Sequence, residues 1–385
     1  MQSHFNGMRT AYGQSARWLQ GNIPNPGTAE KRERPDATRK PDVCYLATMN
    51  SNLLEARRLR KWFPVHGGIL RRAGNPVRAV DDVSFCIRRG EVLGLVGESG
   101  CGKSTLGRVL LQLMPATDGS VIFEGEDITR IGRARMRGLR KRMQIVFQDP
   151  FSSLNPRLTI GSTLREVLLV HDIVPRAEVG RRIDELLRMV GLNDFHARRY
   201  PHEFSSGQRQ RIGIARALAV EPAFLVCDEP VSALDVSIQA QILNLLSDLR
   251  EALDLTYLFI SHDLSVVRHV SDRIAVMYLG RLVEMGPVET IMAEPLHPYT
   301  HALLASAPVA DPDHVRQRPP LGTDVPSPVN IPDGCPFHTR CPEAFAECRQ
   351  VRPVFTDHRK DHRVSCLKYD ACWPDSSPST DKHDD

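Results

Sequence analysis

The sequence predicts an α/β protein built around a mostly parallel β-sheet. Two runs, VLGLV (Val92–Val96) and AFLVC (Ala223–Cys227), are short and continuously apolar, and TYLFIS (Thr256–Ser261) is similar. Such runs are typical of strands that are buried on both faces of a parallel sheet. The stretch AQILNLLSDLREAL (240–253) is instead amphipathic at helical spacing. Strand-like and helical stretches alternate in this way from about residue 53 to residue 287, which favours the α/β class.

The composition is that of an ordinary globular protein. The chain has 385 residues, of which 41% are hydrophobic and 25% charged, so it can form one large domain with appendages. A formal net charge of +4 is too small to indicate a nucleic-acid partner. No run approaches the roughly 18 apolar residues of a membrane span, and MQSHFNGMRTAYGQS at the start lacks the apolar core of a signal peptide. We therefore expect a soluble, intracellular chain that reaches a membrane only through a partner.

Both ends of the chain differ from the middle. Residues 1–50 are polar and rich in Arg, Pro, Gly and Asn, and we expect them to be disordered, like residues 373–385. A start codon assigned too early, with Met49 as the true start, would explain the N-terminal extension. The main domain is expected over 51–305. A Pro- and Asp-rich linker at 308–334 then leads into a cysteine-rich extension that ends near residue 372.

The first apolar run ends in a phosphate-binding motif. EVLGLVGESGCGKST matches Gly-x4-Gly-Lys-Ser/Thr, with an apolar strand before it and the helix-compatible LGRVLLQLM after it. Glycines let backbone N–H groups turn toward phosphate oxygens, and the following helix directs its positive N-terminal end at the same anion. The lysine contacts the β- and γ-phosphates and the serine can ligate Mg²⁺. The expected ATP-binding residues are Gly97, Glu98, Ser99, Gly100, Cys101, Gly102, Lys103, Ser104 and Thr105.

A second apolar run ends in two carboxylates. FLVCDEP places Asp228 and Glu229 at the end of a predicted strand. By itself such a pair is usually a solvated turn, but the phosphate loop upstream favours a catalytic interpretation. Asp228 would then anchor Mg²⁺, and Glu229 would orient or deprotonate the attacking water.

Five short motifs in a fixed order resemble those of ABC-transporter ATPases, over about residues 53–287. After the phosphate loop come IVFQDP with Gln148, FSSGQ with Ser205–Gln208, the Asp-Glu pair, SALD (Ser232–Asp235) and ISHD with His262. The resemblance implies a P-loop NTPase core of the RecA-like type, with an antiparallel β subdomain and a helical subdomain at about 150–215. The implied activity is ATP hydrolysis coupled to transport across a membrane.

The resemblance also implies roles for these residues. Gln148 would bind ATP and Mg²⁺, and His262 would act in catalysis with Lys103 and Glu229 by sensing the γ-phosphate. Two such chains face each other head to tail, so the signature contacts the ATP of the facing subunit and a neighbouring loop crosses the interface. The signature residues are Ser205, Ser206, Gly207 and Gln208, and the interface loop is Ser232, Ala233, Leu234 and Asp235. Adenine would stack on Phe63, with Trp62 as the alternative and core packing as the competing interpretation of either ring.

One signature position departs from the family pattern. Ser206 stands where the family usually has glycine. If this position needs a positive φ, serine costs on the order of 1 kcal/mol, which would weaken the site on the facing subunit without destroying it.

Longer stretches narrow the resemblance to the ATP-binding subunits of dipeptide/oligopeptide permeases, and to the second of their two paired ATPases. These stretches are VFQDPFSSLNPRLTIG, CDEPVSALDVSIQAQILNLL, EPLHPYTHALL and CPFHTRCPEAFAEC. An importer of this kind has two transmembrane permease subunits, a sister ATPase and an external substrate-binding protein. The chain would then lie peripherally on the cytoplasmic face of the inner membrane and power the import of short peptides, without a nucleic-acid partner.

Other functions remain as alternatives. A soluble ABC ATPase of translation or DNA repair usually carries two cassettes or a long coiled coil, whereas this chain has one phosphate loop and no long heptad run. An inactive partner subunit is disfavoured because Lys103, Asp228, Glu229 and His262 are all present. The cargo could also be nickel, glutathione or another solute, because the ATPase does not touch it.

The cysteines near the C-terminus indicate a possible metal centre. Cys335, Cys341, Cys348 and Cys366 are separated by five, six and seventeen residues, which is not the C-x2-C spacing of zinc sites or bacterial ferredoxins. Disulfides are rare in a cytosolic chain, and four thiolates can hold a tetrahedral metal or an iron–sulfur cluster. The resemblance favours a cluster, such as 4Fe–4S, over zinc. Free buried cysteines in a small packed appendage are the alternative, and Cys372 could be a spare ligand.

Overall fold

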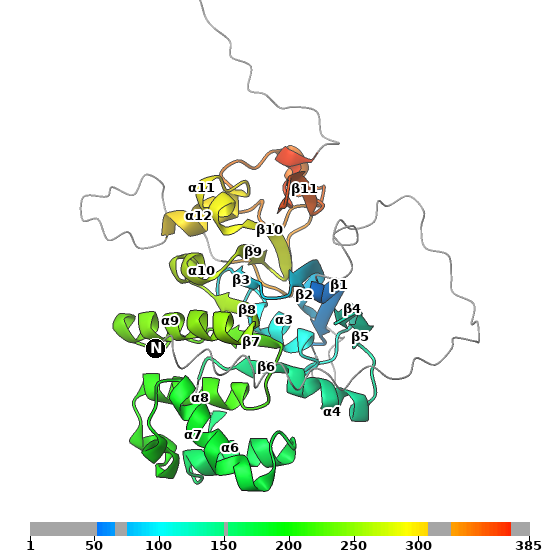
Figure 1. The fold of residues 1–385 in the computed structure, drawn as a ribbon. Helices are drawn as coiled ribbons and strands as arrows, with labels where there is room; N and C mark the ends of the chain where they lie inside the picture. Colours follow the sequence, from blue (N-terminus) through cyan, green and yellow to red (C-terminus); the bar gives the residue numbers. More distant parts are fainter. Residues whose placement is uncertain (1–51, 66–74, 150–152, 307–324, 371–385) are drawn as a thin grey trace, which may run out of the picture.

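A computed structural model of the chain describes residues 52–65, 75–149, 153–306 and 325–370. Both terminal segments expected to be disordered lie outside the described residues, as do Cys372 and much of the Pro-rich linker. Figure 1 shows the described part as a central sheet with helices around it and a helical subdomain at one end. The C-terminal segment (residues 325–370) lies at the opposite end.

The main sheet has eight strands in the order β11-β12-β10-β9-β3-β8-β7-β6. The central strands from β9 to β6 run parallel, and the edge formed by β10, β12 and β11 is antiparallel. The three apolar runs form the neighbouring strands β3, β8 and β7, which confirms this part of the prediction. The bounds are β3 Val92–Val96, β6 Met143–Val146, β7 Phe224–Asp228, β8 Thr256–Ser261, β9 Arg273–Tyr278, β10 Arg281–Pro287, β11 Thr356–Arg359 and β12 His362–Val364.

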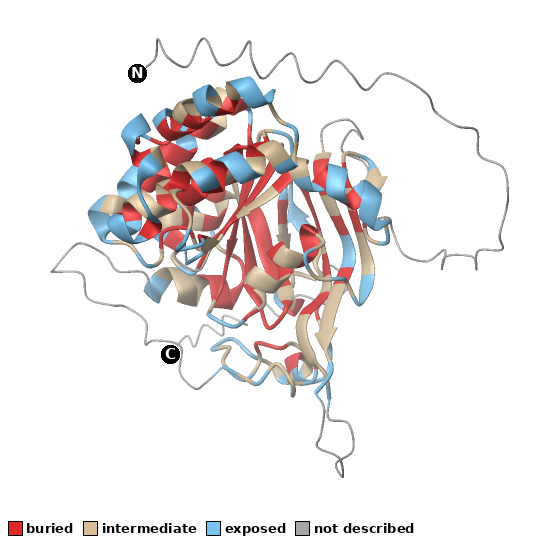
Figure 2. Ribbon diagram, turned by 90° about the horizontal axis from the view of Figure 1, so that it is seen from below, coloured by how far each residue is buried: buried red, intermediate tan, exposed pale blue. Residues whose placement is uncertain are grey.

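The inner strands are buried on both faces because alternate side chains enter two different cores. In β7, Leu225 packs into a core with the helical subdomain, whereas Phe224 and Val226 pack into a core with the antiparallel sheet. All five residues of β3 and of β7 are buried, and Figure 2 shows these strands as the buried centre of the molecule. Alternation across a strand thus gives continuous apolar runs where both faces are covered.

A second sheet is antiparallel, with the order β2-β1-β4-β5. Its strands are β1 Asn52–Phe63, β2 Val77–Arg88, β4 Asp118–Phe123 and β5 Glu126–Asp127. Helix α3 (Lys103–Leu110) lies between the two sheets and contacts β1 and β2 on one side and β7 and β8 on the other. The helix that follows the phosphate loop is therefore fixed by both sheets.

The helical subdomain is formed mainly by α6, α7 and α8, which pack against one another. Thr159 caps α6 by accepting a hydrogen bond from the Ser162 N–H, and Ser205 caps α8 through the Gln208 N–H. The helices of the described residues are α3, α4 Arg133–Arg142, α6 Ile160–Val170, α7 Val179–Met189, α8 Ser206–Leu218, α9 Val236–Leu253, α10 Leu264–Val270, α11 Val288–Ala293 and α12 Pro298–Ser306. Short 3-10 helices occupy Arg176–Glu178, Asp194–Arg198, Pro201–Glu203, Ala346–Arg349 and Leu367–Tyr369.

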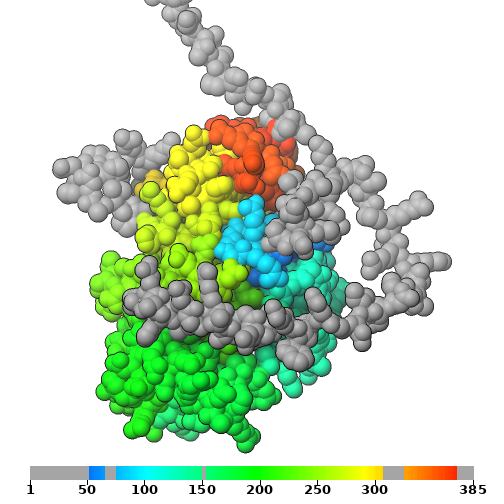
Figure 3. Space-filling model, in the orientation of Figure 1, coloured from blue at the N-terminus to red at the C-terminus, as the bar shows by residue number. Residues whose placement is uncertain are grey.

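The C-terminal segment is continuous with the main sheet. Strand β12 pairs with β10, and β11 pairs with β12, so residues 356–364 extend the sheet that carries the phosphate loop. Figure 3 shows the surface of this segment, in orange, adjoining the yellow surface of the residues near 290–300. No helix among the described residues is long and apolar enough to cross a membrane.

Candidate functional site

The predicted ATP-site residues meet at the carboxyl edge of the parallel strands. The phosphate loop follows β3, Gln148 follows β6, Asp228 and Glu229 end β7, and His262 follows β8. Because neighbouring parallel strands end on the same edge of a sheet, four segments far apart in the sequence form one site there.

The phosphate loop requires glycine at two positions. Gly102, directly before α3, has φ of 107°, and a Cβ there would lie 1.9 Å from the Ala79 carbonyl oxygen. Gly97 has φ of 153°, and its Cβ would lie 2.2 Å from the Met277 carbonyl oxygen. The loop is therefore held against β2 and β9 by contacts that no other residue type permits.

Lys103 is directed back across the loop. Its side chain is buried, and Nζ donates hydrogen bonds to the carbonyl oxygens of Gly97, at 2.7 Å, and Glu98, at 3.0 Å. These bonds hold the ammonium group beneath the loop, where a bound phosphate chain would meet a positive point charge.

Ser104 and Asp228 form a direct pair. Ser104 Oγ donates to Asp228 Oδ1 at 2.7 Å, and Arg108 Nη2 lies 3.8 Å from Asp228 Oδ2. Burial raises the pKa of Asp228, while the bond from Ser104 and the charge of Arg108 act in the opposite direction. A hydroxyl beside a buried carboxylate is a suitable oxygen set for Mg²⁺.

Glu229 is the centre of a second polar group. Gln148 Nε2 donates to Glu229 Oε2 at 2.9 Å, and His262 Nδ1 lies 3.5 Å from the same oxygen. Ser232 Oγ donates to the Glu229 carbonyl oxygen at 3.1 Å, and Gln148 Nε2 lies 3.4 Å from Ser232 Oγ. Glu229 itself has a positive φ of 47°, a conformation that is uncommon for a side chain of this size. The carboxylate at the end of β7 is thus held by groups from the ends of two other strands, β6 and β8.

The signature residues form the start of α8. Ser205 Oγ accepts from the Gln208 N–H and Gln208 Oε1 accepts from the Ser205 N–H, which is a reciprocal capping box. Ser206 is the first residue of the helix and is not among the residues with positive φ. The strain considered for serine at this position does not arise, because a helical φ is unstrained for an L-residue.

The glycine next to it is required for packing. A Cβ on Gly207 would lie 2.5 Å from Ile238 Cγ2 of α9. Close approach of α8 to α9 therefore fixes glycine at 207, whereas position 206 tolerates serine.

The SALD residues connect the catalytic strand to α9. Ser232 contacts Gln148 and Glu229, and the loop ends at Asp235, which precedes the first residue of α9. That first residue, Val236, is 82% exposed.

Phe63 and Trp62 lie at the end of β1 and are both half-buried. The guanidinium groups of Arg78 and Arg60 lie 5.2 and 5.9 Å from the Trp62 ring centre. Lys61 Nζ lies 5.0 Å from the Phe63 ring centre. Among the described residues, two guanidinium groups thus lie over the indole and one ammonium group over the phenyl ring.

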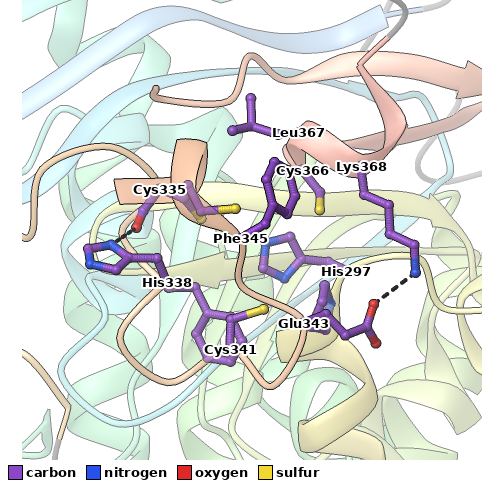
Figure 4. A pocket seen from close by; sticks show the side chains of 12 residues that line it. His297, Cys335, His338, Cys341, Glu343, Phe345, Cys366, Leu367 and Lys368 are labelled. Atoms are coloured by element: carbon purple, nitrogen blue, oxygen red, sulfur yellow. Dashed lines mark hydrogen bonds and ion pairs between the residues drawn. The ribbon is translucent and has the colours of Figure 1, made fainter. Parts of the chain in front are cut away.

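Four cysteines line one cavity beside α12. Cys335, Cys341, Cys348 and Cys366 surround it together with His297, and Figure 4 shows the sulfur atoms of Cys335, Cys341 and Cys366 directed toward the same space. All six cysteines recorded as free, these four among them, are buried or half-buried. The extension thus brings together cysteines that are up to 31 positions apart in the sequence, Cys335 and Cys366.

Burial controls the protonation of these thiols. It raises the pKa of Cys341 to about 11 and that of Cys366 to about 12, and it raises the pKa of Cys335. Backbone N–H groups oppose the shift by donating to sulfur, from Phe337 and His338 to Cys335, from Glu343 to Cys341 and from Lys368 to Cys366. Within the described residues, no three His, Cys, Asp or Glu side chains lie close enough together to hold a metal ion.

Glu98 has partners that the phosphate-loop motif does not indicate. Arg340 donates to both of its carboxylate oxygens, and Tyr299 Oη accepts a hydrogen bond from its N–H. Both partners come from stretches that the sequence singled out for another reason, Tyr299 from EPLHPYTHALL and Arg340 from between the first two cysteines of the cluster.

Comparisons with known proteins place the chain among transporter ATPases. A family model described as "ABC transporter" matches residues 80–232, and one described as "Oligopeptide/dipeptide transporter, C-terminal region" matches residues 283–348. The chain is 50% identical to the oligopeptide transport ATP-binding protein AppF of Bacillus subtilis, over 84% of this chain and 99% of that protein. It is also 50% identical to a probable peptide ABC transporter ATP-binding protein of Sinorhizobium fredii, over 83% and 90% of the two chains.

Solved structures agree with these matches. CbiO1 of Clostridium perfringens, part of the transporter complex cbiONQ, aligns with a TM-score of 0.55 and 27% identity over 63% of this chain and 92% of that one. The dimeric ATP-binding cassette MJ0796 bound to ADP and Pi aligns with a TM-score of 0.54 and 28% identity over 61% and 98%.

Proposed function

Because the chain belongs to the ATP-binding subunits of oligopeptide and dipeptide ABC transporters, we propose that it hydrolyses ATP to power the import of short peptides. The observation that carries this proposal is the meeting of Ser104 with Asp228, and of Gln148 and His262 with Glu229, at one sheet edge. A soluble role in translation or DNA repair is disfavoured by the match of residues 283–348 to the transporter C-terminal region.

The residues divide between binding and chemistry. The backbone of Gly97–Thr105 and the Lys103 ammonium bind the phosphates, and Ser104, Asp228 and Gln148 hold Mg²⁺. When bound by these residues, Mg²⁺ would neutralise charge on the phosphate oxygens. Glu229 orients the attacking water and takes its proton, and His262, 3.5 Å from that carboxylate, senses the γ-phosphate.

Phe63 is the adenine-stacking residue in this proposal. An aromatic ring can stack on adenine only with a face that is free of other partners. The guanidinium groups of Arg60 and Arg78 lie over the Trp62 ring. The ammonium group of Lys61, which has a flexible side chain, lies over the Phe63 ring.

A second ATPase subunit completes the site. Ser205, Ser206, Gly207 and Gln208 bind the ATP held by a facing subunit, and the loop Ser232–Asp235 crosses between them. The dimeric state named for the similar cassette MJ0796 supports this arrangement. We infer that the facing subunit is a sister ATPase, which makes this chain the second of a pair. Two transmembrane permease subunits and an external substrate-binding protein complete the importer. The chain lies on the cytoplasmic face of the membrane, bound to the permeases.

Peptide-stimulated hydrolysis in the assembled complex tests this function. We expect the receptor loaded with a mixed tri- to pentapeptide pool to raise the ATPase rate of the reconstituted complex, because binding energy from the cargo is transmitted through the permeases. Receptor loaded with Ni²⁺ or glutathione is the matched control and should leave the rate at its basal value. Stimulation by one of these solutes in place of peptides would assign a different cargo.

The four cysteines of the C-terminal segment line one cavity. Four thiolates are the usual ligand set of an iron–sulfur cluster. We therefore propose that Cys335, Cys341, Cys348 and Cys366 hold a cluster such as 4Fe–4S, which would stabilise the thiolates that burial otherwise disfavours.

Iron and acid-labile sulfide content, measured after purification without oxygen, tests this assignment. We expect equal amounts of iron and sulfide per chain, and loss of both in Cys341→Ser. Cys227→Ser is the matched control, because Cys227 is buried in β7 and lies outside the cavity. A folded, iron-free wild-type chain would leave the cysteines as packing residues, and zinc without sulfide would assign a single ion.

A further inference from the structure

Glu98 brings a negative charge to a loop that binds an anion. The residue lies inside the phosphate motif, between Gly97 and Ser99, and its side chain is 24% exposed. A free carboxylate at this place would repel the phosphates of ATP, because two negative charges within a Debye length oppose each other. The loop therefore functions best when this charge is neutralised and directed away from the phosphates.

Arg340 supplies that neutralisation from the C-terminal segment. Its Nη1 donates to Glu98 Oε2 at 2.7 Å and its Nη2 donates to Oε1 at 2.8 Å, so the guanidinium forms a two-point pair. The arginine side chain is 3% exposed, which removes the pair from most of the screening by solvent. The pKa of Arg340 is raised, first by its bonds to Glu98.

Residues from three parts of the chain fix the position of this arginine: Tyr278 of β9, Tyr299 of α12 and Phe337 of the C-terminal segment. Tyr278, Tyr299 and Phe337 form a buried aromatic group with ring centres 4.7 to 5.4 Å apart. The Arg340 guanidinium lies 5.9 Å from the Tyr278 ring and 6.0 Å from the Phe337 ring. Tyr299 Oη also accepts the Glu98 N–H at 2.8 Å, so both the backbone and the side chain of Glu98 are held by one packed unit.

We propose that Arg340 is a positioning residue of the ATP site, which holds and neutralises Glu98 so that the phosphate loop accepts a triphosphate. Arg340 lies 242 positions after Glu98 in the sequence, and its contact is with the phosphate loop and not with Glu229 or His262. Through this contact the C-terminal segment becomes part of the nucleotide site, in addition to its pairing with β10.

Binding of the Mg²⁺ complex of AMP-PNP, a non-hydrolysable ATP analogue, to the full-length chain tests the proposal. Arg340→Met keeps an apolar stem against the aromatic group and removes the charge. We expect it to weaken analogue binding about tenfold, with a loss that shrinks as KCl rises from about 0.05 to 0.5 M, because salt screens the repulsion. Arg340→Lys, which keeps the charge but not the two-point geometry, should stay within about threefold of wild type.

Two further variants separate charge from packing. Adding Glu98→Gln to Arg340→Met removes the unpaired carboxylate and should restore affinity to within about threefold of wild type. Arg359→Met is the matched control, because Arg359 pairs with Glu294 on the exposed face of the same segment and should bind as wild type. Each variant's thermal midpoint shows that it is folded, and Arg340→Gln replaces Arg340→Met if the latter does not fold. Equal affinity of Arg340→Met and Arg359→Met, or no restoration by Glu98→Gln, would overturn the proposal.

Discussion

Glu229→Gln is expected to lower ATP turnover of the assembled complex by roughly a hundredfold to a thousandfold. Glutamine has nearly the same shape as glutamate, but it cannot take the proton of the attacking water. In the wild-type chain, Gln148 donates to Glu229 Oε2 at 2.9 Å. The amide oxygen of the substituted glutamine can still accept this hydrogen bond, so the surrounding polar group keeps its arrangement. Single-turnover hydrolysis, measured after rapid mixing with Mg²⁺ and ATP, isolates the chemical step from product release.

Affinity for ATP should survive this change. Glu229 belongs to a different polar group from the loop that binds the phosphates, so we expect the Kd to stay within about threefold of wild type. Glu251→Gln, an exposed position on α9, is the matched control and should keep full turnover. Turnover near the wild-type rate in Glu229→Gln would transfer the role of general base to another group at the same sheet edge.

The sequence predicted the central strands because they depend on local patterns. VLGLV, FLVCD and TYLFIS form neighbouring strands because continuous apolar runs have no other favourable place than the inside of a sheet. The residues expected at the ATP site follow such strands, so the topology alone brings them together, as it does Ser104 and Asp228.

The contribution of the C-terminal segment could not be predicted in this way. Strands β11 and β12 read TDHR and HRV, which lack an apolar run, and they form only because β10 offers a free edge. The pairing of Glu98 with Arg340 has no local signal, since it depends on folding two distant segments against each other. The expectation of backbone strain at Ser206 was wrong for a similar reason, because the motif alone does not reveal that α8 already begins at this residue.

A buried carboxylate holds this C-terminal segment in place. Glu284 of β10 is fully buried, and its oxygens accept hydrogen bonds from the Leu296 N–H at 2.7 Å, the His297 N–H at 3.0 Å and His362 Nε2 at 2.8 Å. One side chain thereby joins β10, the segment before α12, and β12. Burial alone would raise the pKa of Glu284, but these hydrogen bonds outweigh it and lower the pKa below its usual 4.5.

Glu284→Ala is expected to destabilise the chain by about 3–5 kcal/mol, because it leaves three buried donors without an acceptor. In a domain of this size such a loss lowers the thermal midpoint by on the order of 10 °C, as calorimetry would measure. Glu294→Ala is the matched control: its carboxylate is 64% exposed and pairs with Arg359 at the surface, so we expect less than about 1 kcal/mol.

The pH dependence of the stability difference between wild type and Glu284→Ala identifies the Glu284 carboxylate as the source of that difference. A pKa that is lowered on folding contributes stability that is complete above the unfolded value of 4.5 and is lost as the pH falls through the folded value. The gap between wild type and Glu284→Ala should therefore be constant near neutral pH and narrow once the pH falls below about 4.5. A gap as small as that of Glu294→Ala, or one that does not change with pH, would mean that packing of the aromatic group, and not the buried carboxylate, holds the segment on the sheet.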